Sequence, residues 1–337
     1  MNLRCVEYKW ADCAELIRQM CDHNQYLSPY CYEYFLSAIK DHPNIHARRA
    51  HRRCKLRCYV IFDGGRPLVV SPLFFDDKQR KIYLMGEFSS VGHGDLIYPP
   101  SLTASELGAC ISALGEIYSG YTFCLNQVSQ FSLTARAMEE MGVAIQRRDI
   151  CVKIDYSNYA DWYASLRKSC RQNLRTGYNR LSAEGYTPSF CLFVRRKPGK
   201  KETKEAIRLF SKRILEHSHL PGILFAPMCC FKRREAMTTA LLNSPDLIFA
   251  SLYFNEELAA NCHGVIANDG RAIITRLSIQ TDLKKYSPGG LLINELIKAC
   301  GDSYPEISSI DLSRGDEAYK YTYGGTEHYN YSYELSL

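Results

Sequence analysis

Long apolar runs are absent from this sequence. No stretch approaches the roughly 20 consecutive apolar residues that a membrane-spanning helix needs. The first residues, Met-Asn-Leu-Arg-Cys-Val-Glu, are polar and lack the apolar centre of a secretory signal. We therefore expect a cytoplasmic protein without a membrane span, in which the fifteen cysteines are reduced thiols.

The cysteines also lack the spacing of a zinc site. Their number is odd and they are scattered along the chain. His51, Cys54 and Cys58 come closest to a ligand set, but no second ligand pair follows at the spacing that tetrahedral zinc requires. The sequence therefore predicts no metal.

Strong charge of either sign is missing as well. The formal net charge of the 337 residues is +6, which suits an anionic partner such as a phosphorylated cofactor but does not by itself imply nucleic acid. One basic run stands out, and it is either a solvated loop or a contact surface for RNA or phosphate. It consists of Arg48, Arg49, Arg52, Arg53, Lys55 and Arg57.

The chain is long enough for two domains, and its halves follow the same order without sharing an identity-level repeat. Each half has helices, then a long antiparallel hairpin, then a further strand and helix. The hairpins turn at Asp63-Gly64-Gly65 and at Asn255-Glu256-Glu257. We expect two similarly folded α/β units, 1–154 and 155–337, with the tyrosine-rich tail closing the sheet as a strand.

Two further segments carry polar side chains of open function. Apolar residues at helical spacing predict one helix over 162–184, with Arg167, Lys168, Arg171 and Arg175 on one face. That face is either solvated or contacts cofactor phosphates or an acidic acceptor. The loop 92–95 is expected to be flexible, with His93 and Asp95 as turn residues or as acid–base groups.

The richest stretch runs from Tyr286 to Lys320. Ser287 is expected to cap a helix whose first position is Pro288, and glycines 289 and 290 let a ligand approach free N–H groups. Leu291, Leu292, Leu296 and Ile297 form the predicted buried stripe. The strand 307–312 then leads to a cluster of five polar side chains beside the helix start. They are Asp311, Arg314, Asp316, Tyr319 and Lys320.

Three stretches resemble a known family. They are Trp-Tyr-Ala-Ser-Leu-Arg-Lys-Ser-Cys-Arg-Gln-Asn-Leu-Arg at 162–175, Tyr-Ser-Pro-Gly at 286–289 and Asp-Leu-Ser-Arg-Gly-Asp-Glu-Ala-Tyr-Lys at 311–320. The second half resembles the Gcn5-related N-acetyltransferase (GNAT) fold. More specifically, the stretches are similar to bacterial acetyltransferases associated with cellulose and exopolysaccharide biosynthesis, relatives of the Fem aminoacyltransferases. The similarity covers about residues 150–325 well and 1–150 more loosely.

The resemblance implies tandem GNAT-like units, each a mixed, mainly antiparallel sheet flanked by helices, with one acyl-donor site in the second unit. The donor of this fold is usually acyl-CoA, with acetyl-CoA as the first expectation. Pro288 stands where the common pattern has its first glycine, and in the Fem relatives the donor is aminoacyl-tRNA, which the basic run 48–57 would also suit. The pyrophosphate-binding positions are Tyr286, Ser287, Gly289, Gly290 and Leu291.

An N- or O-acyltransferase is the function that we expect, in which an amine or hydroxyl attacks the thioester directly. Asp316 is then the general base or orients the acceptor, and Tyr319 protonates the leaving thiolate. His263 either faces the donor carbonyl or lies in the core. The same two alternatives hold for Arg276 on the following strand. Cys262 is no nucleophile for His263 to activate, because adjacent strand residues face opposite ways.

The acceptor is expected to contact a separate group of side chains. Arg314 and Lys320 either hold an anionic acceptor or pair with Asp311 and Asp316. The substrate-binding candidates are Arg314, Lys320, Asp311, Arg276, Lys168 and Arg171. A non-catalytic binding protein on a degenerate fold is the remaining alternative. Sugar amines, sugar hydroxyls, lipids and amino acids all remain open as acceptors.

Overall fold

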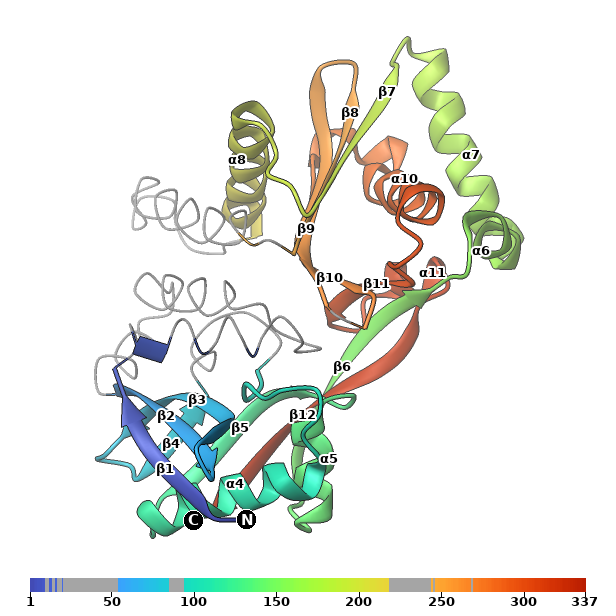
Figure 1. Cartoon of the computed structure of the whole chain (residues 1–337). Helices are drawn as coiled ribbons and strands as arrows, with labels where there is room; N and C mark the ends of the chain where they lie inside the picture. Colours follow the sequence, from blue (N-terminus) through green and yellow to red (C-terminus); the bar gives the residue numbers. More distant parts are fainter. Residues whose placement is uncertain are drawn as a thin grey trace. The chain divides into compact units, whose positions relative to one another are not determined.

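The computed structural model describes residues 1–9, 12, 13, 16, 20, 54–84, 94–217, 244, 246–267 and 269–337. Two compact units make up the chain, one of residues 1–150 with 328–337 and the other of residues 151–327 (Figure 1). Both are α/β, as predicted, with a mixed, mainly antiparallel sheet and flanking helices. Within the described residues, no helix combines the length and the hydropathy that crossing a membrane would require.

The sheet of the first unit has the strand order β1-β2-β3-β4-β5-β12. Among the described strands of this unit only β4 and β5 run parallel, with helix α4 between them in the chain, while the other neighbours are antiparallel. The elements are β1 (Leu3–Tyr8), β2 (Lys55–Asp63), β3 (Arg66–Asp76), β4 (Lys81–Leu84), α4 (Ala104–Ile117), β5 (Thr122–Ser129), α5 (Leu133–Glu140) and β12 (Thr326–Ser336).

The second unit repeats this plan with the strand order β6-β11-β10-β9-β8-β7. Where the structure describes its strands, the single parallel pair is β10 with β11, and helix α10 connects them. The elements are β6 (Ile145–Asp155), α6 (Tyr159–Ser165), α7 (Lys168–Ala183), β7 (Pro188–Val194), α8 (Lys200–His217), β8 (Leu247–Phe254), β9 (Glu257–Ile266), β10 (Arg271–Ile279), the 3-10 helix η1 (Thr281–Tyr286), α10 (Pro288–Ser303), β11 (Ser309–Arg314) and α11 (Ala318–Thr322).

Helices α10 and α8 cover opposite faces of the second sheet (Figure 1). The predicted stripe of α10 is confirmed, because Leu291, Leu292, Leu296 and Ile297 are at most 1% exposed and lie in one core cluster. This cluster also takes the side chains of Ile248, Ala250 and Ala260. Alternate residues of β8 and β9 therefore face α10, and those between them face α8.

The tyrosine-rich tail is the strand β12, as predicted, and it stands next to β5 in the strand order. Tyr331 and Tyr333 of β12 pair with Val128 and Leu125 of β5, so the tail completes the first sheet. Residues 328–337 accordingly group with the first unit, whereas the sequence placed them in the second. Strand period reveals a strand but not its partner, because pairing is a tertiary choice.

The helix expected over 162–184 is broken. Leu166 (ψ 146°) and Arg167 (ψ 145°) are extended, so α6 ends at Ser165 and α7 begins at Lys168. Arg171 stabilises the break, since its Nη1 donates to the carbonyls of Ala164 (2.6 Å) and Leu166 (2.8 Å). Apolar residues recur at helical spacing both before and after Leu166 and Arg167, so the sequence pattern did not indicate a break there.

Asp95 is not part of a flexible loop. Its buried carboxylate accepts hydrogen bonds from Leu96 N (2.8 Å), the Tyr98 hydroxyl (2.9 Å) and the Thr134 hydroxyl. Burial raises the pKa of this carboxyl to about 6. Asp95 therefore ties its segment to the start of α5, and His93 lies outside the described residues.

Candidate functional site

Strands β10 and β11 separate after three residue pairs. They pair from Arg271 with Ser309 to Ile273 with Asp311, while β10 continues beside β9 as far as Ile279. A bulge between Ile274 and Arg276 marks the point of separation. Two stretches of strand backbone therefore face each other without pairing, and such an edge can bind an extended ligand through main-chain hydrogen bonds.

The start of α10 is open to an anion. Ser287 precedes the helix in the left-handed conformation (φ 57°, ψ 49°) and makes no side-chain cap, contrary to expectation. Its carbonyl accepts from Leu291 N (3.0 Å), and Pro288 has no N–H. Gly289 N and Gly290 N have no hydrogen-bond partner among the described residues, and Gly289 is the less buried of the two, so the helix start has an unsatisfied N–H group near its surface.

This helix start lies beside the end of β10. A Cβ on Gly289 would stand 3.3 Å from Ile279 Cγ2, and one on Gly290 would overlap the Tyr323 hydroxyl. Gly290 is therefore needed for the approach of Tyr323, whatever ligand binds. Burial raises the pKa of Tyr323 to about 12, so its phenol is protonated at neutral pH.

Tyr323 was missed because it belongs to the beginning of the tyrosine-rich tail, which was predicted to be a strand throughout. The segment is instead the short helix α11, with Tyr323 as its C-terminal cap. Residues four apart share a helix face, so a helical interpretation of Tyr319 and Tyr323 was the available signal.

The corresponding helix of the first unit has a different start. The Thr103 hydroxyl accepts from Glu106 N (3.2 Å), and the Glu106 carboxylate accepts from Thr103 N (2.8 Å). This capping box satisfies the N–H groups and places a negative charge there. The first unit therefore lacks, at α4, the anion site that α10 offers.

The last residue of β11 and the loop after it present two of the predicted polar side chains to solvent. Asp316 and Arg314 are exposed, and neither side chain has a partner within the described part of the chain. Tyr319 is 41% exposed, and its pKa is raised to about 12 by burial and then by the charge of Glu317. The loop thus combines an available carboxylate with a phenol that keeps its proton.

Lys320 has another task than the one expected. The side chain is 2% exposed, and its ammonium donates to the carbonyls of Ser313 (3.0 Å), Arg314 (2.9 Å) and Gly315 (3.0 Å). Its ion pair is with Glu317 (2.9 Å), not with Asp311 or Asp316. Lys320 therefore holds the loop in shape and has no donor left for a substrate.

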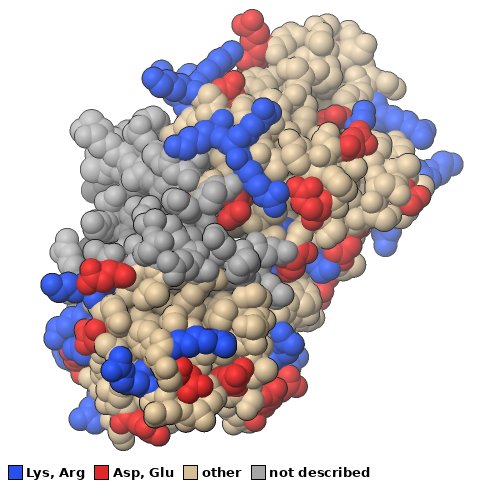
Figure 2. Space-filling view, in the orientation of Figure 1, with Lys and Arg blue, Asp and Glu red and all other residues tan. Residues whose placement is uncertain are grey.

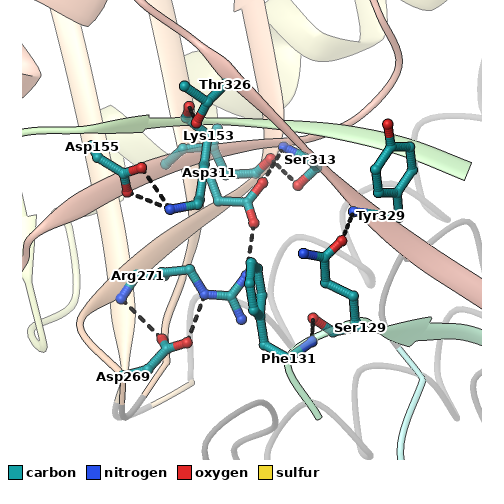
Figure 3. A network of polar contacts seen from close by, with 12 residues as sticks. Ser129, Phe131, Lys153, Asp155, Asp269, Arg271, Asp311, Ser313, Thr326 and Tyr329 are labelled. Carbon is teal, nitrogen blue, oxygen red and sulfur yellow. Dashed lines mark hydrogen bonds and ion pairs between the residues drawn. The ribbon is translucent and has the colours of Figure 1, made fainter. Parts of the chain in front are cut away.

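Asp311 is likewise committed to the fold. It is fully buried, and its carboxylate accepts from Arg271 Nη1 (3.2 Å) and from Ser313 N (2.8 Å), as Figure 3 shows. Arg271 also pairs with Asp269 (2.7 Å). These contacts fix the point at which β10 and β11 part, so Asp311 positions the backbone and is not placed to bind a substrate.

Of the predicted cofactor-binding residues, Tyr286 and Leu291 could contact a cofactor only through their backbone atoms. Tyr286 is 1% exposed, its ring packs edge-on against Phe254, and its hydroxyl donates to Glu184. Leu291 is a core residue of α10. Of the five predicted positions, Ser287, Gly289 and Gly290 form the helix start itself.

His263 and Arg276 lie on the α8 face of the sheet. The His263 ring stacks on Phe249 (17° between planes), and its Nδ1 lies 3.0 Å from Asn261 Oδ1. Arg276 stands over the Phe210 ring of α8 at 5.4 Å. Burial, and then the charge of Arg276, lowers the pKa of His263 to about 3. His263 is therefore neutral and in the core, the second of its two expected places.

His263→Gln is expected to reduce the fall in the free energy of unfolding that the protein shows as the pH is lowered below 6.5. The unfolded chain binds a proton at His263 near pH 6.5 and the native protein only near pH 3, so this stabilisation is complete above pH 6.5 and lost as the pH falls. Between pH 7 and pH 5 the loss amounts to about 2 kcal/mol. Urea unfolding of both proteins across this range measures it, and parallel curves would refute the assignment.

The basic face of α7 is only partly available. Arg171 is occupied by the break between α6 and α7, whereas Lys168, the first residue of α7, is exposed. In the basic run, Lys55 pairs with Asp77 (2.9 Å) and Arg57 donates to the Tyr118 hydroxyl (3.0 Å). The four arginines 48, 49, 52 and 53 lie outside the described residues.

Comparison with known proteins adds a family to this geometry. Residues 168–321 match the family model described as "Acetyltransferase (GNAT) domain". This segment contains the separated strands, the start of α10 and the loop after β11. No protein with a curated description matches the sequence.

Solved structures share the fold over nearly the whole chain. FemX is 9% identical, covers 99% of this chain and 97% of its own, and has a TM-score of 0.61. A protein of unknown function from Bacteroides thetaiotaomicron is 14% identical over 99% of both chains, with a TM-score of 0.56. L-PGS from Bacillus licheniformis is 13% identical over 93% of both chains, with a TM-score of 0.51. The second unit thus matches the GNAT domain model over residues 168–321, and the chain as a whole has the fold of these structures.

Proposed function

We propose that the protein is an acyltransferase that moves an acetyl or other acyl group from acyl-CoA to an amine or hydroxyl. The observation that carries this proposal is the contrast between the two parallel-strand crossovers. The start of α10 is uncapped, bears two glycines and lies beside separated strands, whereas the start of α4 is closed by Thr103 and Glu106. Only the second unit then takes the donor.

The donor would bind with its pyrophosphate on Gly289 N and Gly290 N and its extended arm against the free edge of β10. The acceptor nitrogen or oxygen attacks the thioester carbon, the C–S bond breaks, and the thiolate takes a proton. Tyr319 and Tyr323 both keep their protons at neutral pH and are the candidates to supply it. Asp316 would accept the proton of the acceptor or orient it.

The acceptor would approach the exposed loop that carries Arg314 and Asp316. A carboxylate without a partner suits the amine or hydroxyl of a small molecule or saccharide, because it accepts a hydrogen bond from either. The resemblance to exopolysaccharide acetyltransferases supports a saccharide as the first class to test. Arg314 would add affinity for an acceptor with an acidic group.

Aminoacyl transfer from aminoacyl-tRNA is the second candidate, and the fold shared with FemX favours it. Against it, Lys55 and Arg57 of the basic run already have partners. On the face shown in Figure 2, basic and acidic side chains are interspersed in the described part. A non-catalytic protein that only binds the donor is the remaining alternative.

Thermal unfolding with acetyl-CoA, longer acyl-CoAs and free CoA tests the donor. At about a hundred times its dissociation constant, a ligand adds roughly 2.7 kcal/mol to the stability. Asp316→Asn should keep this shift and lose about 10²-fold in turnover, because a general base contributes at least that much. No shift with any CoA compound would overturn the donor assignment.

Asp302→Asn is the matched control, since it removes one exposed carboxylate from the far end of α10. It should keep both the shift and the turnover. A donor shift with full turnover in Asp316→Asn would remove Asp316 from the mechanism. A donor shift without transfer to any amine or hydroxyl would favour the binding protein.

A further inference from the structure

The first unit contains a groove of about 800 Å³ that the proposed acyl transfer does not use. This volume lies in the upper part of the range of small-molecule sites. Helix α5, the beginning of β6 and strand β12 supply its walls. Among the residues that line it are Arg136, Val143, Ile145, Arg148, Tyr331 and Tyr333.

The charge of this groove is positive. Arg136, Arg147 and Arg148 line it, against the single carboxylate of Glu139. Arg147 is paired with Asp149 (2.9 Å). Arg136 and Arg148 are exposed and form no ion pair within the described ranges. A guanidinium binds phosphate or carboxylate with two parallel hydrogen bonds, so these two arginines are suited to an anionic group.

The floor of the groove is aromatic and apolar. Tyr333 is 2% exposed and lies in the core of the first unit, and Tyr331 is half-buried above it. The Arg148 guanidinium carbon lies 5.8 Å from the centre of the Tyr331 ring. Val143 and Ile145 add apolar surface. A planar ring that packs on Tyr331 would take the place of the Arg148 guanidinium over that ring and leave the guanidinium to pair with an anion.

We propose that this groove binds a nucleotide, with the base against Tyr331 and the phosphate on Arg136 and Arg148. An inorganic anion alone would not cover the aromatic floor of the groove. An apolar ligand would remove water from Arg136 and Arg148 without giving either guanidinium a hydrogen-bond acceptor. A nucleotide supplies both the ring and the anion. The same chemistry occurs in a free nucleotide and at the end of a single-stranded nucleic acid, where arginines and aromatic rings also combine.

Isothermal titration of the full chain with ADP, AMP, adenosine and inorganic phosphate tests the proposal. ADP should bind saturably with a Kd below about 1 mM, and adenosine and phosphate should each bind at least tenfold more weakly. Arg136→Ala and Arg148→Ala should each weaken ADP at least tenfold. Tyr331→Phe should retain binding, because it keeps the ring.

Arg66→Ala is the matched control, since Arg66 is an exposed arginine of the same unit outside the groove. It should bind ADP like the unchanged protein. A short oligonucleotide that binds more tightly than ADP, and is lost in Arg148→Ala, would identify a nucleic-acid end as the source. An ADP stoichiometry and affinity that are unchanged in Arg136→Ala and Arg148→Ala, or phosphate that binds as well as ADP, would overturn the proposal; one ADP site that survives both substitutions while another is lost is the pyrophosphate site proposed at α10.

Discussion

Gly264→Ala is expected to unfold the second unit or to reduce its free energy of unfolding by more than about 4 kcal/mol. Gly264 pairs with Ile274 of β10 on one side and with Ile248 of β8 on the other. A Cβ at this position would overlap the Ile273 carbonyl oxygen and lie 2.8 Å from its carbon. The obstacle is backbone in a central strand, which cannot rotate away.

This loss is large against the 5–15 kcal/mol that holds a typical domain together. Gly185→Ala is the control, because Gly185 lies in the same unit with open space around its Cβ position and a φ of +73°. It should cost only about 1–2 kcal/mol of left-handed strain. Urea unfolding followed by circular dichroism compares the two, and equal midpoints would contradict the steric argument.

Lys320→Met is expected to cost about 3 kcal/mol or more and to disorder the loop that carries Asp316. Methionine fills similar space but leaves the carbonyls of Ser313, Arg314 and Gly315 without their shared donor. Each hydrogen bond to a charged group contributes about 1.5–3 kcal/mol. Because the same loop presents the proposed base, turnover should fall further than stability alone would explain.

Hydrogen exchange separates the two effects of this substitution. The amides of residues 313–318 should lose protection in Lys320→Met while those of α10 keep it. Lys298→Met removes an exposed lysine from α10 and should stay within about 0.5 kcal/mol of the unchanged protein. Unchanged loop protection in Lys320→Met would show that the clamp does not order the loop.

Local sequence signals located the elements around the site. The turn at Gly64 and Gly65 has positive φ values of 55° and 100° and joins β2 to β3, as the sequence predicted. Pro288 opens α10, again as predicted. Such features depend on one or two residues with strong backbone preferences, so they can be predicted from the sequence without knowledge of the fold.

The hydrogen-bond partners of individual side chains could not be predicted from the sequence in the same way. Lys320 and Arg171 were expected to reach a substrate, yet their donors hold nearby carbonyls. A long cationic side chain serves either purpose, and only burial decides between them. The separation of β10 from β11 was equally hidden, because a strand's sequence does not state where its pairing ends. The roles of Asp316, Tyr319 and Arg314 stay predictions.

The position of β12 has a consequence for the order of folding. Residues 151–327 form one uninterrupted unit, whereas the first unit needs residues 328–337 to cover β5. During synthesis the later-made unit can therefore finish first, while the earlier-made one waits with an exposed sheet edge. Completing the sheet of the N-terminal half therefore means pairing residues about 200 positions apart, which closes a long loop late in synthesis.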